Sequence, residues 1–503
     1  MRNHLADVLL AAGAGHAPFM IHPQGGGMSY AAMLAGSARM AQALVALGVR
    51  PGDRVAAQVA KSPEAILLYL GAVRAGAVFL PLNTAYTIAE LDYFLSDARP
   101  ALVVCDPASR DGLVPVGARA GALAVDTLDA QGGGSLATLA AAQSADFTNV
   151  AREKDDLAAI LYTSGTTGRS KGAMLSHGNL ASNALTLAKL WRFSASDVLL
   201  HALPIYHTHG LFVATNVALV SGCAMIFMAK FDANEVIRQM PQATCMMGVP
   251  TFYTRLLQHP GLTPAATAHM RLFVSGSAPL LAETHRDWAQ KTGHAILERY
   301  GMTETSMITS NPYDGERMAG TVGFPLPDVS LRVADAETGR HLGTGEIGVI
   351  EVKGPNVFRG YWQNPEKTAA EFRADGFFIT GDLGKVDKGG YVHIVGRGKD
   401  LIITGGFNVY PKEVENEIDA MAGVVESAVI GVPHGDFGEA VVAVVVRGGD
   451  GGPDAGAVQA FLESRLAKFK QPKRIVFVAD LPRNAMGKVQ KATLRAQYAG
   501  LLA

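Results

Sequence analysis

The sequence predicts an α/β protein: a large N-terminal domain of helix-covered sheets with a small β-barrel-like part, followed by a small α+β C-terminal domain. Three observations predict it. Short apolar runs alternate with helical segments up to about Gly320, as sheets of largely parallel strands require. Glycine-punctuated runs with β-like alternation follow. Finally, 503 residues are too many for a single hydrophobic core, so at least two domains are expected.

The N-terminal alternation begins with a helix over 31–47, in which apolar residues recur every three or four positions. A glycine ends it, and a Pro-Gly-Asp turn leads into a strand over 55–59. The apolar segment over 65–82 contains Arg74 and Pro81, so it is a buried helix-turn-strand rather than a membrane span. The same pattern predicts strands over 101–105, 157–162, 224–228 and 271–275 and a helix over 282–292.

The pattern changes after about residue 320. We place a domain boundary near 396–399, between an N-terminal domain of 1–397 and a C-terminal domain of 400–503. Before the boundary, strands that would form a barrel or a small antiparallel sheet are expected over 330–334, 348–353 and 391–395. After it, we expect a strand over 401–404, a helix over 411–421, strands over 426–432 and 440–447, a glycine-rich loop over 448–456 and a helix reaching Lys468.

Charge and cysteine content exclude several function classes. The chain has 44 Lys+Arg against 45 Asp+Glu, a formal net charge of −1, which argues against a dedicated nucleic-acid or polybasic membrane binder. Cys105, Cys223 and Cys245 are far apart in the sequence, so neither a disulfide framework nor a zinc site is expected. These cysteines indicate a reducing, hence cytoplasmic, compartment. Because Asp7 interrupts the first apolar stretch, we expect no targeting signal.

One loop is suited to binding a polyphosphate. It follows the strand over 157–162 and combines hydroxyls, two cations and glycines, which let backbone N–H groups approach phosphate oxygens. Its G-x-x-G-x-x-K spacing differs from that of a Walker A loop. A flexible polar surface loop is the alternative. The loop consists of Thr163, Ser164, Gly165, Thr166, Thr167, Gly168, Arg169, Ser170 and Lys171.

Other short segments carry side chains that could bind a ligand or take part in a reaction. The segment 298–305 places acids, an aromatic ring and hydroxyls at a strand end, where α/β proteins bind ligands and where a glutamate can hold Mg²⁺. The segment 275–279 offers small-residue backbone against which a flat ring can lie. Asp382 and Arg397 could bond ribose hydroxyls, and Lys488 lies in a near-terminal loop. Taken singly, each is more typical of a turn or a surface residue.

In this order, the motifs resemble those of the adenylate-forming superfamily of acyl-CoA synthetases, luciferases and nonribosomal-peptide adenylation domains. The matching patterns are T-S-G-T-T-G-x-x-K, Y-G-M-T-E, T-G-D, G-R-x-x-D and P-R-x-x-x-G-K, and they span essentially the whole chain. The resemblance implies a two-step reaction. A carboxylate attacks the α-phosphorus of ATP to give acyl-AMP and pyrophosphate, and a thiol then attacks the anhydride. ATP, Mg²⁺ and coenzyme A are implied.

The resemblance also assigns roles to residues. Lys488 would bridge the carboxylate and the α-phosphate, Glu304 would hold Mg²⁺ and Thr303 would contact phosphate. The C-terminal domain would then rotate about a hinge at 398–400, centred on Lys399. Rotation would bring forward a thiol channel formed by Gly405, Gly406 and Phe407. The implied ATP- or AMP-binding residues are Thr163, Ser164, Gly165, Thr166, Thr167, Gly168, Lys171, Ser277, Ala278, Pro279, Glu298, Arg299, Tyr300, Gly301, Met302, Asp382 and Arg397.

The acid is expected to lie among residues 204–210 and near Met307. His209 could donate to an anionic substrate group, and a packed neutral histidine is the alternative. Two histidines without acidic or cysteine partners do not indicate zinc. Arg286 would bind a second carboxylate if it points inward, which favours a small dicarboxylic acid, and a surface arginine is the alternative. The expected substrate-binding residues are His207, Thr208, His209, Arg286 and Met307.

Longer strings narrow the resemblance. H-A-L-P-I-Y-H-T-H-G-L-F, G-V-P-T-F-Y-T-R-L-L and E-R-Y-G-M-T-E-T resemble bacterial malonyl-CoA synthetases, which activate malonate and often methylmalonate. Thr208 and Met307 would then flank the α-carbon and set the tolerance for a methyl branch, a difference worth only about 1–3 kcal/mol. The run Ser306-Met307-Ile308 is less polar than in that group and leaves the pocket width open.

Other functions remain as alternatives. Acetate, propionate or an aryl acid could be the substrate of the same machinery. An adenylation enzyme that loads a carrier-protein thiol is a second class, although no carrier domain follows before Ala503, so we expect free CoA. A non-catalytic nucleotide sensor would not need Lys488. This lysine is also a candidate target of a protein lysine acetyltransferase, because acetylation would remove its charge.

Overall fold

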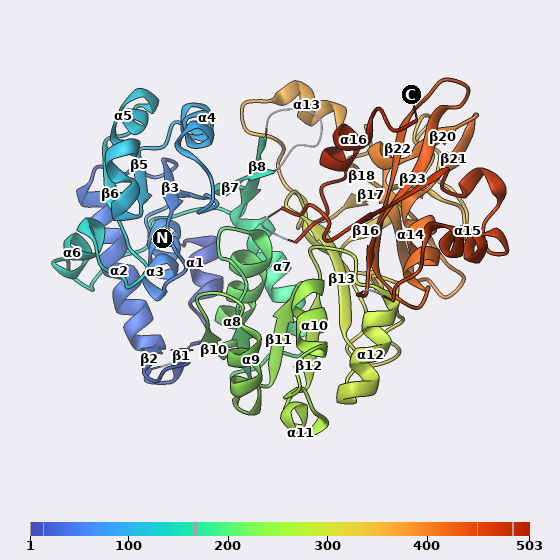
Figure 1. Ribbon diagram of the computed structural model, residues 1–503. Helices are drawn as coiled ribbons and strands as arrows, with labels where there is room; N and C mark the ends of the chain where they lie inside the picture. The colour runs from blue at the N-terminus through green and yellow to red at the C-terminus, as the bar shows by residue number, and fades with distance from the viewer. Residues whose placement is uncertain (1, 14, 164–169, 450, 485–486, 503) are drawn as a thin grey trace.

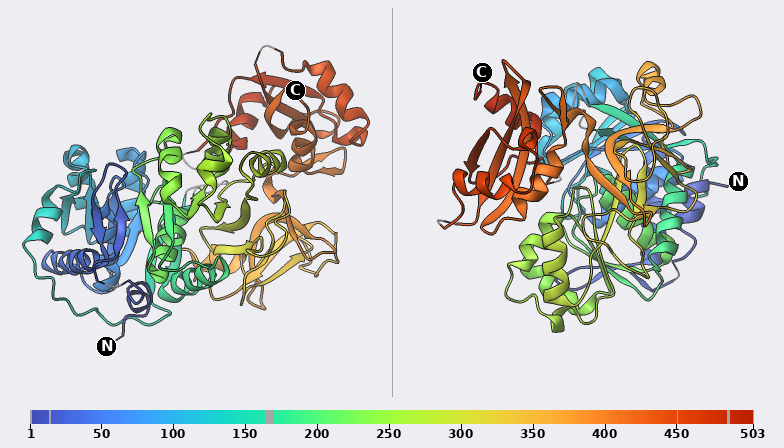
Figure 2. Two further views of the ribbon diagram at one scale, coloured as in Figure 1. Left: turned by 90° about the horizontal axis from the view of Figure 1, so that it is seen from below. Right: turned by 90° about the vertical axis from the view of Figure 1, so that its right-hand side faces the viewer.

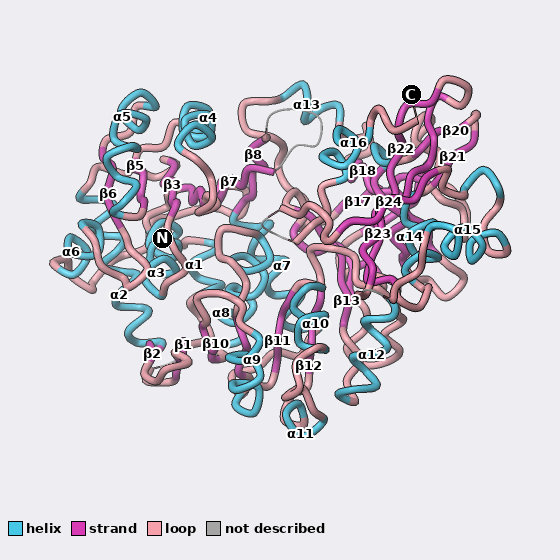
Figure 3. Tube along the Cα trace, viewed as in Figure 1, coloured by secondary structure: helices cyan, strands magenta, loops and turns pink. Residues whose placement is uncertain are grey.

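Two helix-covered sheets lie side by side in the computed structural model, and a small antiparallel sheet and a C-terminal unit adjoin them (Figure 1). The structure describes residues 2–13, 15–163, 170–449, 451–484 and 487–502. Strands and helices alternate along most of the chain (Figure 3), which confirms the predicted α/β class. None of the helices within those ranges has the length and apolarity needed to cross a membrane.

The first sheet has six strands in the order β6-β5-β3-β4-β7-β8, with β7–β8 antiparallel and the other pairs parallel. Parallel neighbours need crossover connections, which the helices provide. The strands are β3 (Arg54–Gln58), β4 (Val78–Pro81), β5 (Leu102–Cys105), β6 (Ala124–Thr127), β7 (Leu157–Thr163) and β8 (Lys171–Ser176). The helices are α2 (Tyr30–Ala46), α3 (Pro63–Arg74), α4 (Ile88–Ala98), α5 (Arg110–Ala120) and α6 (Ser135–Ala141).

The second sheet has nine strands in the order β15-β14-β13-β12-β11-β9-β10-β1-β2, parallel in the middle and antiparallel at both edges. A π-helix over His209–Thr215, which the periodicity does not predict, lies between β9 and α8. The strands are β1 (Pro18–Ile21), β2 (Gly27–Ser29), β9 (Val198–His201), β10 (Ala224–Phe227), β11 (Cys245–Gly248), β12 (Leu272–Ser275), β13 (Leu297–Met302), β14 (Ser306–Ser310) and β15 (Phe324–Pro325). The helices are α1 (His4–Leu9), α7 (His177–Leu190), α8 (Asn216–Ser221), α9 (Ala233–Gln239), α10 (Pro250–Leu257), α11 (Pro264–Thr267) and α12 (Ala282–Thr292).

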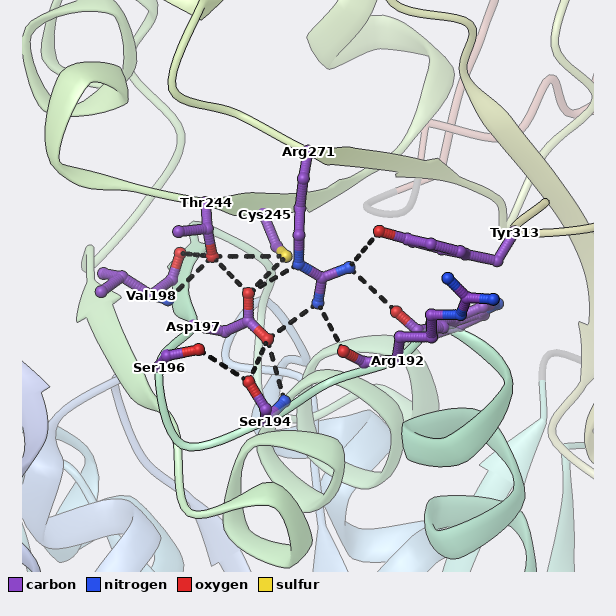
Figure 4. Close-up of polar contacts among 10 residues, drawn as sticks. Arg192, Ser194, Ser196, Asp197, Val198, Thr244, Cys245, Arg271 and Tyr313 are labelled. Carbon is purple, nitrogen blue, oxygen red and sulfur yellow. Dashed lines mark hydrogen bonds and ion pairs between the residues drawn. The ribbon is translucent and has the colours of Figure 1, made fainter.

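An ion pair joins the starts of three neighbouring strands of this sheet (Figure 4). Asp197, just before β9, accepts hydrogen bonds from Arg271 Nε at 2.7 Å, Arg271 Nη2 at 2.8 Å and Thr244 Oγ1 at 2.7 Å. Burial alone would raise the pKa of Asp197, but the hydrogen bonds from Arg271 and Thr244 lower it. The network fixes the starts of β9, β11 and β12, whose opposite, carboxyl ends lead into the candidate site.

A four-stranded antiparallel sheet follows, in the order β16-β17-β18-β19. It is the sheet rather than the barrel of the two predicted forms. Its strands are β16 (Ser330–Ala334), β17 (Gly348–Lys353), β18 (Phe378–Val386) and β19 (Val392–Arg397), with α13 (Pro365–Ala370) between β17 and β18.

The C-terminal unit is a separate body with its own core (Figure 2), in which Val414 and Ile418 of α14 pack against Val429 and Val441 of its sheet. The helix predicted to reach Lys468 ends at Glu463. The strands are β20 (Ile402–Thr404), β21 (Phe407–Val409), β22 (Val424–His434), β23 (Gly438–Arg447) and β24 (Arg474–Val478), and the helices are α14 (Pro411–Asp419), α15 (Ala455–Glu463) and α16 (Lys491–Tyr498).

Candidate active site

The ribose-binding pair expected from two separate motifs is brought together by the small sheet. Asp382 of β18 and Arg397 of β19 are cross-strand partners, and Arg397 Nε lies 2.7 Å from Asp382 Oδ1. The hydroxyl of Tyr300, from β13, donates to the other oxygen of the same carboxylate. The aromatic side chain of one motif and the acid and arginine of two others therefore form a single cluster, as a nucleoside site requires.

Glu304 is the expected metal ligand. It is buried, and burial raises its pKa despite a hydrogen bond from the Tyr361 hydroxyl to Oε1 at 3.1 Å. In the part of the chain that the structure describes, no group of three acidic, histidine or cysteine side chains could hold a metal by itself. A single carboxylate nevertheless fits Mg²⁺, because this ion usually binds one or two carboxylates together with substrate phosphates.

The two ends of the candidate phosphate loop face each other as paired residues. Thr163 of β7 is the cross-strand partner of Lys171 of β8, whose ammonium lies 3.9 Å from Glu371 Oε1. The pairing closes the loop at its base and places Lys171 near Glu371. The loop residues Ser164, Gly165, Thr166, Thr167, Gly168 and Arg169 lie outside the described residues.

Lys488 reaches the site from the C-terminal unit. A Cβ at the preceding Gly487 would lie 3.5 Å from Thr251 Oγ1, so this loop packs against α10. The ammonium interacts electrostatically with Arg397 and Glu304, among others. Burial, together with the positive charge of Arg397, lowers the pKa of Lys488 to about 8. The catalytic lysine expected from the motif is thus close to the groups expected to hold ribose and metal.

The histidine segment is buried beside Ser277. A side chain at Gly210 would place its Cβ 2.0 Å from the Pro204 carbonyl oxygen, so a glycine permits the tight path into the π-helix. His209 Nδ1 lies 3.2 Å from Ser277 Oγ, whose residue has the strained φ of 71°. Burial, reinforced by Arg299, lowers the pKa of His209 well below its ordinary value, and burial with Lys488 lowers that of His207 to about 3. Both imidazoles are therefore neutral.

Arg299 lies near these histidines. It is buried, and its Nε and Nη2 have no hydrogen-bond partner among the described residues. Burial raises the pKa of the adjacent Glu298 and lowers that of Arg299 to about 9, although the two side chains interact electrostatically. Gly276 is required beside it, because a Cβ there would lie 2.3 Å from Arg299 Cζ. Other buried polar atoms without partners here are Thr208 Oγ1, His209 Nε2, Ser275 Oγ, Glu298 Oε2 and Ser306 Oγ.

The expectation about Arg286 needs correction. Arg286 is exposed on α12, because the buried face of this helix carries Thr284, His285 and Trp288. It therefore does not point into a pocket as the dicarboxylate hypothesis required. Arg299, which the motif placed with the nucleotide, is buried and interacts electrostatically with His207 and His209. The missed signal was the charged pair Glu298-Arg299 directly after the apolar residues Ile296 and Leu297, because a buried cation needs a partner.

The motif around Glu298 also differs from the expected loop. Glu298 to Met302 belong to β13, which pairs with β12 on one side and β14 on the other. Glu298 Oε1 accepts a hydrogen bond from Leu280 N at 3.2 Å, so this glutamate supports the 277–280 segment. A Cβ at Gly301 would lie 1.9 Å from the Ser306 carbonyl oxygen. Met307 is buried, Thr303, Met302, Ser277 and Ala278 are half-buried, and Pro279 is exposed.

The residues expected to form the thiol channel lie elsewhere. Gly405 and Gly406, with φ of 57° and 82°, form the turn between β20 and β21. Both positive angles suit a tight hairpin and favour glycine. Phe407 is 56% exposed and stacks on Phe469 with centroids 4.7 Å apart. The hairpin lies on the outer side of the C-terminal unit (Figure 1), and Lys399 at the junction is exposed.

Comparisons with known proteins match this geometry. The ATP-bound structure of MatB from Rhodopseudomonas palustris is 62% identical and covers 100% of both chains, with a TM-score of 0.98. The apo structure of MatB, at the same identity and coverage, gives 0.87, so the arrangement described above is closer to the ATP-bound one. Feruloyl-CoA synthase from an Amycolatopsis species is 36% identical over 94% of this chain and 94% of its own length. The malonate–CoA ligase of Arabidopsis thaliana is 34% identical over 89% of this chain and 78% of its own length.

The match to a family model is equally extensive. The model described as AMP-binding enzyme covers residues 10–362, and that described as AMP-binding enzyme C-terminal domain covers residues 413–488. The family expected from the ordered motifs is thus confirmed, and the clustering of those motifs in space agrees with it. The chain belongs to the AMP-binding enzyme family, whose first matched region contains Tyr300 and Glu304 and whose second contains Lys488.

Proposed function

We propose that the protein ligates malonate to coenzyme A at the expense of ATP, through malonyl-AMP, with release of AMP and pyrophosphate. The observation that carries this proposal is the buried guanidinium of Arg299, whose Nε and Nη2 have no hydrogen-bond partner among the described residues. Relatives with 34–36% identity include enzymes named for feruloyl and malonate substrates, so the acid is inferred from Arg299 itself.

A dicarboxylate would provide an anion for both Lys488 and Arg299. One carboxylate would lie near Lys488, where it attacks the α-phosphorus, and the other would accept hydrogen bonds from Arg299 and His209. An acetate, a propionate or an aryl acid would leave the buried guanidinium without an anion, which is costly. The 62% identity to MatB and the malonate–CoA ligases among the relatives support the same acid.

Methylmalonate is included in the proposal as a second substrate. Thr208 and Met307 are both buried and would flank the α-carbon. A methyl group changes binding by only about 1–3 kcal/mol, so a branched substrate is disfavoured or accepted by small changes in pocket width.

In the first step, two anions must approach each other. Lys488 and Lys171 would supply positive charge at the carboxylate and the β,γ-phosphates, and Asp382 with Arg397 would hold the ribose. Glu304 would hold Mg²⁺, which supplies further charge at the phosphates when bound. Thr303 and the Thr163–Lys171 loop would contact the phosphates, and the half-buried Ser277–Ala278 backbone would lie against the adenine.

In the second step, the C-terminal unit would rotate about 398–400 at Lys399 and exchange Lys488 for the Gly405–Gly406–Phe407 hairpin. The separate core of this unit and the lower TM-score against the apo form of MatB support a rigid-body motion. Free CoA is the proposed thiol. The glycine turn would allow a pantetheine arm to approach the backbone closely.

Two regulatory and cellular features complete the proposal. A protein lysine acetyltransferase would inactivate adenylation by neutralising Lys488, whose charge is used in that step only. The three cysteines are buried free thiols, which is consistent with a reducing cytoplasmic compartment.

A panel of acids tests the substrate. Pyrophosphate release and CoA thioester formation should be strongest with malonate, lower with methylmalonate and weak with acetate, propionate and benzoate. Arg299→Met should lower kcat/KM for malonate by about two to three powers of ten, with a smaller change in KM for ATP. Arg286→Met, an exposed arginine, is the matched control and should leave both constants unchanged. Equal activity of Arg299→Met and wild type towards malonate would refute the proposal.

A further inference from the structure

A short segment, 358–362, joins the candidate metal ligand to the strand that carries Lys171. At one end, the backbone N–H of Phe358 donates to the Glu304 carbonyl oxygen at 2.7 Å. At the other end, Trp362 N donates to the Gly172 carbonyl oxygen at 2.7 Å, and Tyr361 pairs with Ala173 as an isolated antiparallel bridge. Elements separated by more than a hundred residues are thus held together by the segment 358–362.

Tyr361 is the residue of this segment whose side chain contacts Glu304. It is 4% exposed, and its hydroxyl lies 3.1 Å from Glu304 Oε1 and 2.6 Å from Glu371 Oε2. A phenol has one hydrogen to donate, so the two carboxylates share it and each is held within reach of the same oxygen. The T-shaped contact with the Phe358 ring, with centroids 4.9 Å apart, fixes the plane of the phenol.

Glu371 extends the contacts to the phosphate side. Its Oε1 lies 2.6 Å from Lys367 Nζ and 3.9 Å from Lys171 Nζ. The Lys171 ammonium also lies 5.1 Å from the centroid of the Tyr361 ring, a cation–π contact. A continuous chain of contacts therefore runs from Glu304 through Tyr361 and Glu371 to Lys171.

We infer that Tyr361 is a positioning residue for the nucleotide's metal and phosphates: it holds the carboxylate of Glu304 and the ammonium of Lys171 at a fixed separation. The inference rests on the proposed roles of Glu304 and Lys171. Groups that hydrogen-bond a metal ligand orient it in advance, and their loss typically costs about 10- to 100-fold in metal affinity. An oriented carboxylate matters most where, as among the described residues here, no group of three acidic, histidine or cysteine side chains could hold the metal.

Calorimetry of ATP binding over a series of Mg²⁺ concentrations, without acid or CoA, tests the inference apart from turnover. Tyr361→Phe should raise the half-saturating Mg²⁺ concentration about tenfold while the melting temperature without nucleotide changes little. Tyr30→Phe is the matched control, since this equally buried phenol on α2 donates to the Cys223 carbonyl oxygen at 2.8 Å and should leave the Mg²⁺ dependence unchanged. If Tyr361→Phe folds poorly, Glu371→Gln should show a smaller shift in the same direction.

Glu304→Gln separates this inference from the proposed function. A large Mg²⁺ shift in Glu304→Gln together with a wild-type dependence in Tyr361→Phe would overturn the positioning role alone. A wild-type dependence in Glu304→Gln would overturn the proposed metal role, and the positioning role with it. Equal shifts in Tyr361→Phe and Tyr30→Phe would assign the effect to the loss of any buried hydroxyl and would also overturn the inference.

Discussion

Lys488 enters a site that already contains several charged groups, and its own charge should limit the first half-reaction in alkaline solution. Burial lowers its pKa to about 8, so the ammonium is present below that pH and is lost above it. We expect kcat/KM for ATP in pyrophosphate release, which reports the free enzyme, to fall as pH rises through 8. Thioester formation from supplied malonyl-AMP should show no such decline as pH rises through 8. Parallel decline of both activities would contradict the role of Lys488.

The two arginines show what a sequence can and cannot establish about single residues. The motifs placed Asp382, Arg397 and Glu304 in one site, and the structure brings them together because short patterns around glycine encode local geometry. Arg286 was wrongly placed because helix-face orientation depends on packing partners. The role of Arg299 depends on its burial beside Glu298 and on the space left by Gly276, which are properties of the assembled fold.

At the scale of elements, the Asp197–Arg271 pair should be an important determinant of stability. It links the starts of β9, β11 and β12, and Asp197 is 4% exposed. Asp197→Ala would leave the guanidinium of Arg271 partly buried without an anion, and we expect a loss of about 2–4 kcal/mol in urea unfolding.

Asp92→Ala provides the comparison for that measurement. Asp92 pairs with Arg119 at 2.8 Å, but both side chains are exposed, at 46% and 59%. Pairs of this kind contribute about 0–1 kcal/mol. Similar destabilisation by the two substitutions would show that the buried network has no special role in holding the sheet.

Elements with a clear period were predicted well, and those that depend on neighbours were not. The helix over 282–292 and the strands over 330–334 and 348–353 have the expected bounds, because apolar periodicity and glycine turns define them. The 298–302 segment was expected to be a loop at a strand end, yet Glu298 pairs with β12 and residues 299–302 pair with β14, which makes it part of a strand. The π-helix at 209–215 leaves no periodic signal in so short a segment.

At the scale of the whole molecule, buried neutral histidines should make the protein sensitive to acid. Burial lowers the pKa of His177 to about 4 and that of His207 to about 3, and it lowers those of His201 and His209 well below the ordinary value. Unfolded histidines bind protons as pH falls below about 6.5, whereas these do not. Stability should therefore be lost as pH falls from about 6.5 towards 4, by up to about 1.4 kcal/mol per pH unit for each histidine.

Urea unfolding between neutral pH and pH 5 measures this slope. His177→Asn should make it shallower by the contribution of one proton, because asparagine keeps an acceptor for the Leu5 N–H that now donates to His177 Nδ1 at 3.3 Å. The histidine lies away from the candidate site, beside α1 and α7, so activity serves as a check on folding. An unchanged slope in this variant would contradict the account.

The buried guanidinium of Arg299 should affect the stability of the folded protein as well as substrate selectivity. Its Nε and Nη2 have no hydrogen-bond partner among the described residues, and burial disfavours its charged form. The substrate would then be the missing counterion of the native state as well as a reactant. Any ligand that binds only the folded form stabilises it by mass action. The amount of folded enzyme would in this way rise and fall with the supply of the dicarboxylate that it consumes.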